Sequence, residues 1–180
     1  SRSVNAENPT GEKGKGGMAP SNLGPSRKGS PCLRNLASGS VTTLADIKGP
    51  GVINHIWITV ADQTEKDYYV LRDDEETPSV ESPLGDFFCC GFARDCIVNS
   101  LPICVVPARG FNCYFQMPFG KRARITLENQ HETELECFFY QIDYLELDEQ
   151  PEDTLYFHAQ WRREKLTQLQ KDYTILDGVK

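Results

Sequence analysis

Residues Glu136–Leu147 read ECFFYQIDYLEL, and the side chains at alternate positions form two different sets. Successive side chains of an extended chain point to opposite faces of a sheet, so this stretch predicts one long strand with two distinct faces. The face that we expect in a core carries Phe138, Tyr140, Ile142 and Tyr144. The opposite face carries Phe139, Gln141, Asp143 and Leu145.

A second stretch, Val52–Val60, reads VINHIWITV and alternates in the same way. The apolar positions, which predict a core face, are Ile56, Ile58 and Val60. The positions between them, which we expect to face a partner surface or a cleft, are His55, Trp57 and Thr59.

Further short runs rich in β-branched and aromatic residues are separated by turn-forming residues, a pattern typical of strands. These runs are Val41–Ile47, Asp67–Arg72, Cys96–Val98, Ile103–Val106, Asn112–Met117, Ala123–Glu128 and Leu155–Gln160. About eight or nine strands with little helical spacing between them predict an all-β fold, an antiparallel β-sandwich of the jelly-roll form. The only helix that we expect is a short one within Arg162–Lys171.

The chain has 180 residues, of which 39% are hydrophobic and 25% charged, and these values are typical of one globular domain. Residues 1–40 are rich in Gly, Pro, Ser and Asn and show no sustained periodicity, so we expect an N-terminal arm and loops there. We assign residues 41–180 to the jelly-roll domain.

The net charge is −7, from 19 basic and 26 acidic residues, which argues against a nucleic-acid partner. Of the seven cysteines, several lie in apolar runs, where a reduced Cys packs as a small hydrophobic residue, so we expect a reducing compartment and a cytoplasmic location. No Cys or His has zinc-ligand spacing, so we expect no metal. No apolar run approaches the roughly 20 residues of a membrane helix, so we expect no membrane partner.

Two motifs fail as catalytic signatures. In Gly11–Gly17, GEKGKGG, Lys15 precedes Gly rather than Ser or Thr, so a phosphate-binding loop is not indicated. His55, His131 and His158 lie far apart without a nucleophile motif, so hydrolysis through Ser or Cys is not indicated either.

Two other features fit a sugar ligand. Trp57, and Trp161 beside His158 and Gln160, offer aromatic faces near planar polar groups. Trp161 could equally close a core edge or a subunit interface. The acidic run Asp73–Glu76 could supply paired carboxylates or a cation site, or could be a charged rim paired with Lys or Arg.

Strings along nearly the whole chain resemble, in matching order, the N-terminal half of glycoside hydrolase family 172. They are SRSVNAENPTGEKGKGG, TLADIKGPGVINHIWIT, DDEETPSVESPLGDFF, NSLP, FNCYFQMPF, ITLEN, YQIDY, YFHAQWRRE and DYTILDGVK. The family includes enzymes that act on α-D-fructofuranosides, difructose anhydrides and D-arabinofuranosides.

The resemblance implies two consecutive jelly rolls per subunit, assembly into homotrimers or hexamers, an oligosaccharide substrate and no cofactor. It also implies a retaining mechanism with two glutamates, in motifs that lie past the DYTILDGVK segment, so we assign no catalytic residue here. Our candidates for substrate binding are Glu7, Asn8, Glu12, Lys13, Trp57 and His158.

The chain departs from the family pattern at one point, because Arg72 meets Asp73 directly where relatives carry about three more residues. An odd-numbered deletion exchanges the two faces of a strand unless a bulge absorbs it. The alternative to a portion of a furanoside hydrolase is a non-catalytic module that binds carbohydrate or assembles oligomers.

Overall fold

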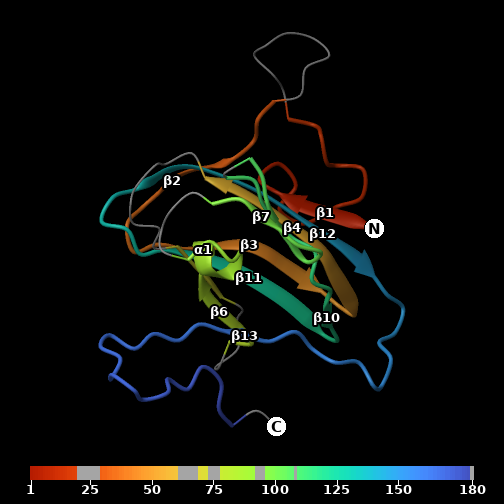
Figure 1. Ribbon diagram of the computed structural model, residues 1–180. Helices are drawn as coiled ribbons and strands as arrows, with labels where there is room; N and C mark the ends of the chain where they lie inside the picture. Colours follow the sequence, from red (N-terminus) through yellow and green to blue (C-terminus); the bar gives the residue numbers. More distant parts are fainter. Residues whose placement is uncertain (20–28, 61–68, 73–77, 92–95, 108, 179–180) are drawn as a thin grey trace.

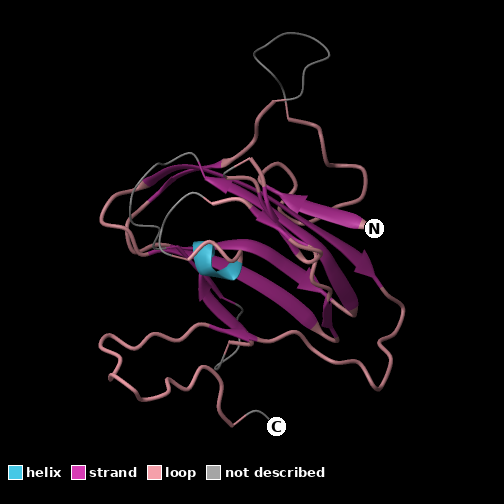
Figure 2. Ribbon diagram, viewed as in Figure 1, coloured by secondary structure: helices cyan, strands magenta, loops and turns pink. Residues whose placement is uncertain are grey.

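The computed structural model describes the chain except for residues 20–28, 61–68, 73–77, 92–95, 108 and 179–180. Two β-sheets pack face to face (Figures 1 and 2), so the predicted antiparallel β-sandwich is confirmed. The eight-stranded sheet, called the larger sheet below, has the order β1-β12-β4-β9-β8-β7, with β10 paired to β4 and β2 to β12. The five-stranded smaller sheet has the order β13-β6-β5-β11-β3. Only the β13–β6 pair is parallel among these described pairings.

The strands of the larger sheet are β1 (Arg2–Asn5), β2 (Leu33–Leu36), β4 (Gly51–Val60), β7 (Val98–Asn99), β8 (Ile103–Val105), β9 (Phe111–Cys113), β10 (Met117–Phe119) and β12 (Leu135–Glu146). Those of the smaller sheet are β3 (Val41–Lys48), β5 (Tyr69–Arg72), β6 (Val80–Pro83), β11 (Arg122–Asn129) and β13 (Ala159–Gln160). One short helix, α1 (Leu84–Phe87), follows β6.

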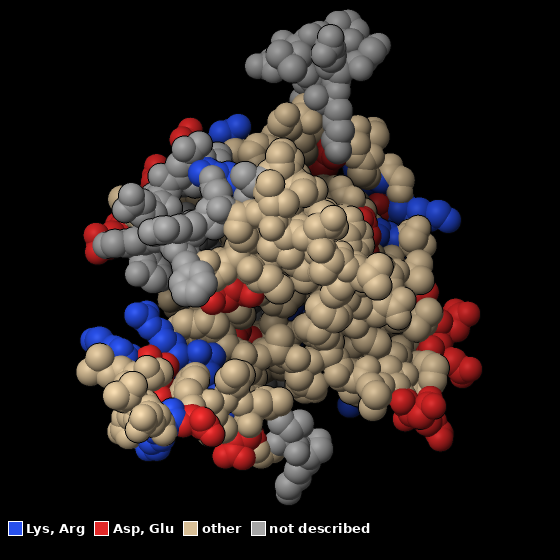
Figure 3. Space-filling view, viewed as in Figure 1, with Lys and Arg blue, Asp and Glu red and all other residues tan. Residues whose placement is uncertain are grey.

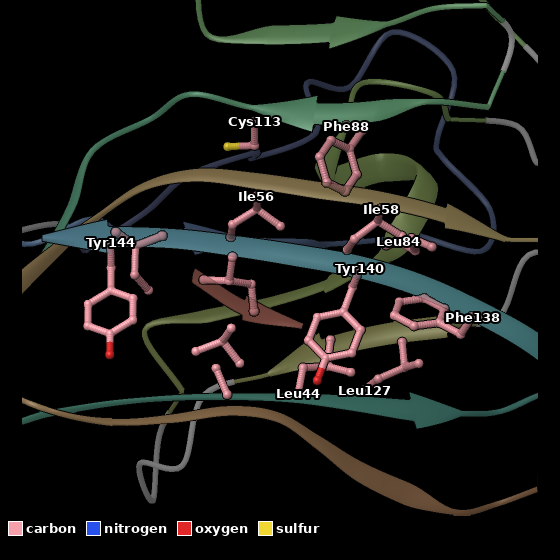
Figure 4. Close-up of a cluster of buried hydrophobic side chains, with 14 of the residues drawn as sticks. Leu44, Ile56, Ile58, Leu84, Phe88, Cys113, Leu127, Phe138, Tyr140 and Tyr144 are labelled. Atoms are coloured by element: carbon pink, nitrogen blue, oxygen red, sulfur yellow. The ribbon is translucent and has the colours of Figure 1, made fainter. Parts of the chain in front are cut away.

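The core lies between the two sheets and is built from rows of paired residues. Directly paired residues of neighbouring strands point to the same face, and one such row runs Val4, Ile142, Ile56, Cys113 and Ile103. All five side chains are buried. Figure 4 shows residues of this row and of the next, among them Ile58 and Tyr140, converging on side chains of the smaller sheet.

The face prediction for the two decisive stretches is confirmed. In β12 the side chains of Phe138, Tyr140, Ile142 and Tyr144 are all buried. In β4, Ile56 and Ile58 are buried and Val60 packs against the same core. Ile53 also faces the core, three positions before Ile56, because the register shifts by one residue opposite Asp143 and Tyr144. A bulge of this kind restores the inward face after an odd spacing.

Other expectations need correction. The strands β1 and β2 lie within residues 1–40, where we expected only an arm and loops, and β6 and α1 were not anticipated. The segment Asn112–Met117 belongs to two strands, and only Ala159–Gln160 of the run Leu155–Gln160 is a strand. The helix expected within Arg162–Lys171 is absent from this fully described segment. Its leucines are exposed, and an isolated helix of this length without a packing partner is unstable in water.

The expectation of reduced cysteines also needs correction, for four of the seven. Cys32 is bonded to Cys137, and Cys90 to Cys96, whereas Cys89, Cys104 and Cys113 are free thiols. The sequence contained no signal for these pairs, because Cys32 reaches Cys137 only through the pairing of β2 with β12. No helix in the described part of the chain is long and apolar enough to cross a lipid bilayer.

Candidate functional site

The outward face of the larger sheet, called the larger-sheet face below, carries a row of polar and aromatic side chains. Its members are paired across six strands, from β1 to β7, in the order Asn5, Gln141, Trp57, Asn112, Cys104 and Asn99. This row lies one position along each strand from the buried row that contains Ile56, so it points away from the core. Trp57, which was expected to face a partner or a cleft, is partly exposed at its centre.

His55 occupies the centre of a hydrogen-bond network on the same face. Its Nδ1 lies 3.0 Å from Oδ2 of Asp143, and its Nε2 lies 3.2 Å from Oδ1 of Asn112. The ring of Tyr114 stacks on the imidazole with 4.7 Å between centroids and 7° between planes. Gln141 donates from Nε2 to both carboxylate oxygens of Asp143, at 3.1 Å each.

The orientation of Asn112 fixes what His55 can do. The Nδ2 of Asn112 donates to the carbonyl oxygens of Cys104 and Gly110, at 3.2 and 2.9 Å, so its Oδ1 is the atom that faces His55. A carboxylate and an amide oxygen are both acceptors. Both ring nitrogens of His55 therefore lie against oxygen atoms of this network, one of Asp143 and one of Asn112. In this arrangement His55 holds the neighbouring side chains in position.

The four candidates of the N-terminal loop divide into two kinds. The carboxylate of Glu7 accepts from the backbone amides of Gly17 and Ala19, and Asn8 bonds to Ser3 and Glu12 through their backbone atoms. Glu7 and Asn8 thus hold the loop together. Glu12 and Lys13 are exposed at its tip and remain available to a ligand.

His158 lies apart from these residues. It is exposed in the segment that leads into β13, and β13 belongs to the smaller sheet, whereas Trp57 belongs to the larger one. Nearby, Nε1 of Trp161 donates to Oδ1 of Asp86 at 3.1 Å, which anchors the segment after β13 beside α1. The structure therefore brings Glu7, Asn8 and Glu12 together in one loop but does not join His158 to Trp57 in one sheet.

The acidic run Asp73–Glu76 and the junction of Arg72 with Asp73 lie at or beyond the edge of the described residues, so their roles stay predictions. Within the described ranges, no group of three or more His, Cys, Asp or Glu side chains is arranged to hold a metal ion.

The shifted ionisable groups do not resemble an acid–base pair. The hydrogen bond from Arg122 lowers the pKa of Asp46, whereas a catalytic acid needs a raised one. Burial raises the pKa of Cys113 to about 11 and that of Tyr140 to about 12. Burial also raises the pKa of Tyr144, which packs under Gly11 of the N-terminal loop.

Sequence reasoning did not select four residues of this network as candidates: Tyr114, Asn112, Gln141 and Asp143. A signal existed for two of them, because Gln141 and Asp143 are polar positions on the outward face of the first stretch. Asn112 and Tyr114 carried no such signal, since only the pairing of β9 with β4 places them beside His55 and Trp57.

The two packed sheets define the chain as a β-sandwich domain, and the larger-sheet face carries a network of polar and aromatic side chains. The family model described as "GH172 first beta-sandwich domain" matches residues 11–162. The chain therefore belongs to the GH172 family and contains the first β-sandwich domain of that family. A search of curated proteins finds no match to the chain.

Proposed function

We propose that this chain is the first jelly roll of a glycoside hydrolase that acts on furanosides, with α-D-fructofuranoside or D-arabinofuranoside linkages as substrates. The observation that carries the proposal is the family match over residues 11–162. We also propose that the 180 residues alone do not catalyse hydrolysis, and that the two glutamates of the retaining mechanism lie outside them.

Four of the described carboxylates support this second point. A retaining glycosidase places two carboxyl groups about 5 to 5.5 Å apart on either side of the glycosidic bond. Asp46 and Glu146 are instead bonded to Arg122 and Arg2 on the surface. The carboxylates of Asp143 and Glu7 are engaged by side-chain and backbone donors.

For substrate contacts we propose Glu12, Lys13, Trp57 and His158, with Glu7 and Asn8 shaping the N-terminal loop that presents the first two. Glu12 and Lys13 offer a charged pair at an exposed loop tip, and Trp57 offers a ring for the apolar face of a sugar.

We propose assembly into a homotrimer or hexamer, as the family resemblance implies. The cytoplasmic location remains an untested prediction. The two disulfides favour an oxidising compartment over it, because the cytosolic thiol pools keep most cysteines reduced.

The test is hydrolysis of aryl α-furanosides by the purified 180-residue chain. We expect no release of the aryl alcohol above the rate in buffer, whereas turnover by the isolated chain would contradict our placement of the catalytic pair.

Calorimetry with fructose- or arabinose-containing oligosaccharides tests the substrate contacts. We expect Lys13→Ala to weaken any binding, with Lys15→Ala as the matched control on the same exposed loop. If the two substitutions change the affinity for the oligosaccharide equally, Lys13 makes no specific contact with the substrate.

A further inference from the structure

Three cysteines are gathered at the C-terminal end of α1, and one of them is a free thiol. Cys90 is bonded to Cys96, and its side chain is buried in the core cluster. Cys89, immediately before it in the sequence, is an exposed free thiol. A thiolate can attack a neighbouring disulfide and displace one of its sulfur atoms. The turn after α1 therefore holds both reactants of a thiol–disulfide exchange.

The backbone of this turn holds Cys89 in an unfavourable conformation. The amide of Cys90 donates to the carbonyl of Gly85 at 2.7 Å, and the amide of Cys89 donates to that of Asp86 at 3.0 Å. This pair of hydrogen bonds is the Schellman arrangement, in which the left-handed position is usually Gly. Cys89 occupies that position with a φ of 63°. Because a side chain is disfavoured there, a rearrangement that takes Cys89 out of the turn relieves this conformation.

The same turn anchors the chain after β13. Nε1 of Trp161 donates to Oδ1 of Asp86 at 3.1 Å, and a Cβ at Gly91 would lie 3.6 Å from that oxygen. The carbonyl of Asp86 accepts from the amide of Cys89, so Asp86 connects Cys89 with Trp161. All described residues from Trp161 to Gly178 are exposed. Figure 1 draws this segment in blue outside the two sheets, and Figure 3 shows charged atoms of both signs over it. The bond to Asp86 therefore lies where the segment leaves the sandwich.

We propose that Cys89, Cys90 and Cys96 form a disulfide-exchange switch that controls the attachment of Trp161. The thiolate of Cys89 attacks Sγ of Cys96, the bond between Cys96 and Cys90 breaks, and Cys90 leaves as a thiolate that takes up a proton. One thiol is consumed and one is formed, so the step needs neither an oxidant nor a reductant. Cys96 is partly exposed and open to attack, and a neutral thiol suits the buried site of Cys90.

The distances permit this exchange after a small movement of the turn. The Cα atoms of Cys90 and Cys96 are 6.0 Å apart. Because consecutive Cα atoms are about 3.8 Å apart, the Cα of Cys89 is no more than about 10 Å from that of Cys96. A disulfide spans about 4.4 to 6.8 Å between Cα atoms, so a shift of about 3 Å suffices. This shift moves the amide of Cys89 away from the carbonyl of Asp86 and disturbs the residue to which Trp161 donates.

Peptide mapping of the unchanged chain tests the covalent step. The protein is held at pH 8 without reductant, quenched with acid to protonate the attacking thiolate, and digested with pepsin. Fragmentation of the linked peptides in the mass spectrometer then distinguishes the adjacent cysteines. We expect two isomers, in which Cys96 is bonded either to Cys90 or to Cys89. Cys89→Ser should abolish the second isomer. The bond between Cys32 and Cys137, which has no cysteine beside it in the sequence, is the internal control and should not exchange.

Fluorescence of Trp161 tests the consequence, in a Trp57→Phe background that leaves one tryptophan. Cys89→Ser fixes the first bond, and Cys90→Ala oxidised with cystine fixes the second. Trp161 is 42% exposed, so we expect its quenching by acrylamide to rise about twofold when the second bond releases it. Asp86→Ala in the Cys89→Ser chain is the matched control, because it removes the acceptor of the indole without changing the disulfide. It should raise the quenching by the same factor.

Two results would overturn the proposal. The first is the absence of a bond between Cys89 and Cys96, both in the unchanged chain after days at pH 8 and in oxidised Cys90→Ala. The second is equal quenching of Trp161 in the two fixed forms. Because the mapping uses the unchanged chain, a folding defect in a variant does not affect it. Neither result depends on hydrolysis, so the proposed furanoside activity is tested separately.

Discussion

Removing the disulfide between Cys32 and Cys137 should be one of the most damaging changes outside the core. This bond joins residues 105 apart in sequence and attaches the segment before β2 to β12. A cross-link stabilises mainly by restricting the unfolded chain, and for a loop near 100 residues the restriction is worth about 4.7 kcal/mol. The bond between Cys90 and Cys96 closes a separation of only 6, for which the same relation gives about 2 kcal/mol.

The perturbation is the double variant Cys32→Ala/Cys137→Ala, compared with Cys90→Ala/Cys96→Ala as the matched control. Guanidinium unfolding without reductant, followed by tryptophan fluorescence, gives the free energy of unfolding of each. We expect the first variant to lose about 2 to 3 kcal/mol more than the second, because each variant removes two sulfur atoms and the closed loops differ in length.

Equal losses in the two variants would refute the loop-length reasoning. A wild type in which all seven cysteines react with iodoacetamide after denaturation without reductant would refute the pairing itself.

Two other predictions concern ionisable groups. Asp46→Asn should lower the free energy of unfolding by less than about 1 kcal/mol at pH 7, because the pair with Arg122 is on the surface. The hydrogen bond from Arg122 lowers the pKa of Asp46 below its usual 3.8, so this contribution is complete above pH 3.8 and is lost as the pH falls through the folded pKa. A difference between the variant and the wild type that does not shrink as the pH falls below 3.8 would contradict the assignment. Among the free thiols, Cys89 should react with a disulfide reagent at pH 8 at least 100-fold faster than buried Cys113, whose pKa of about 11 leaves only about one part in a thousand as thiolate. Comparable rates, measured by peptide mass spectrometry, would contradict the burial of Cys113.

The fold could be predicted where one strand carries its own two faces. The alternation around Phe138 and Ile142 fixes which side of β12 is buried, because period-two patterning needs no knowledge of the partner strand. Strand β1 has no such pattern in four residues. Val4 is buried only because β12, more than 130 residues later, supplies the edge on which β1 pairs. The helix predicted within Arg162–Lys171 does not form for a different reason. The segment has local helix propensity, but its side chains have no surface to pack against.

The candidate site shows the same division. Trp57 was identified as outward-facing from its own strand, and its partial exposure agrees. The place of its neighbour Asn112 depends on pairing between strands that are far apart in the sequence, and a single sequence does not specify the register of that pairing. Lone polar residues in short strands therefore need the structure before their neighbours are known.

The position of β12 has a consequence for the order in which the molecule is made. β12 pairs with β1 and β2 along one edge and with β4 along the other. The first two strands therefore gain their hydrogen-bonding partner only when one of the last strands has been made. During synthesis at about 5 to 20 residues per second, β1 and β2 emerge several seconds or more before their edge exists. Such long-range pairing is slow to form. Until β12 is synthesised, the apolar side chains of β1, β2 and β4 that pack around it stay exposed to solvent.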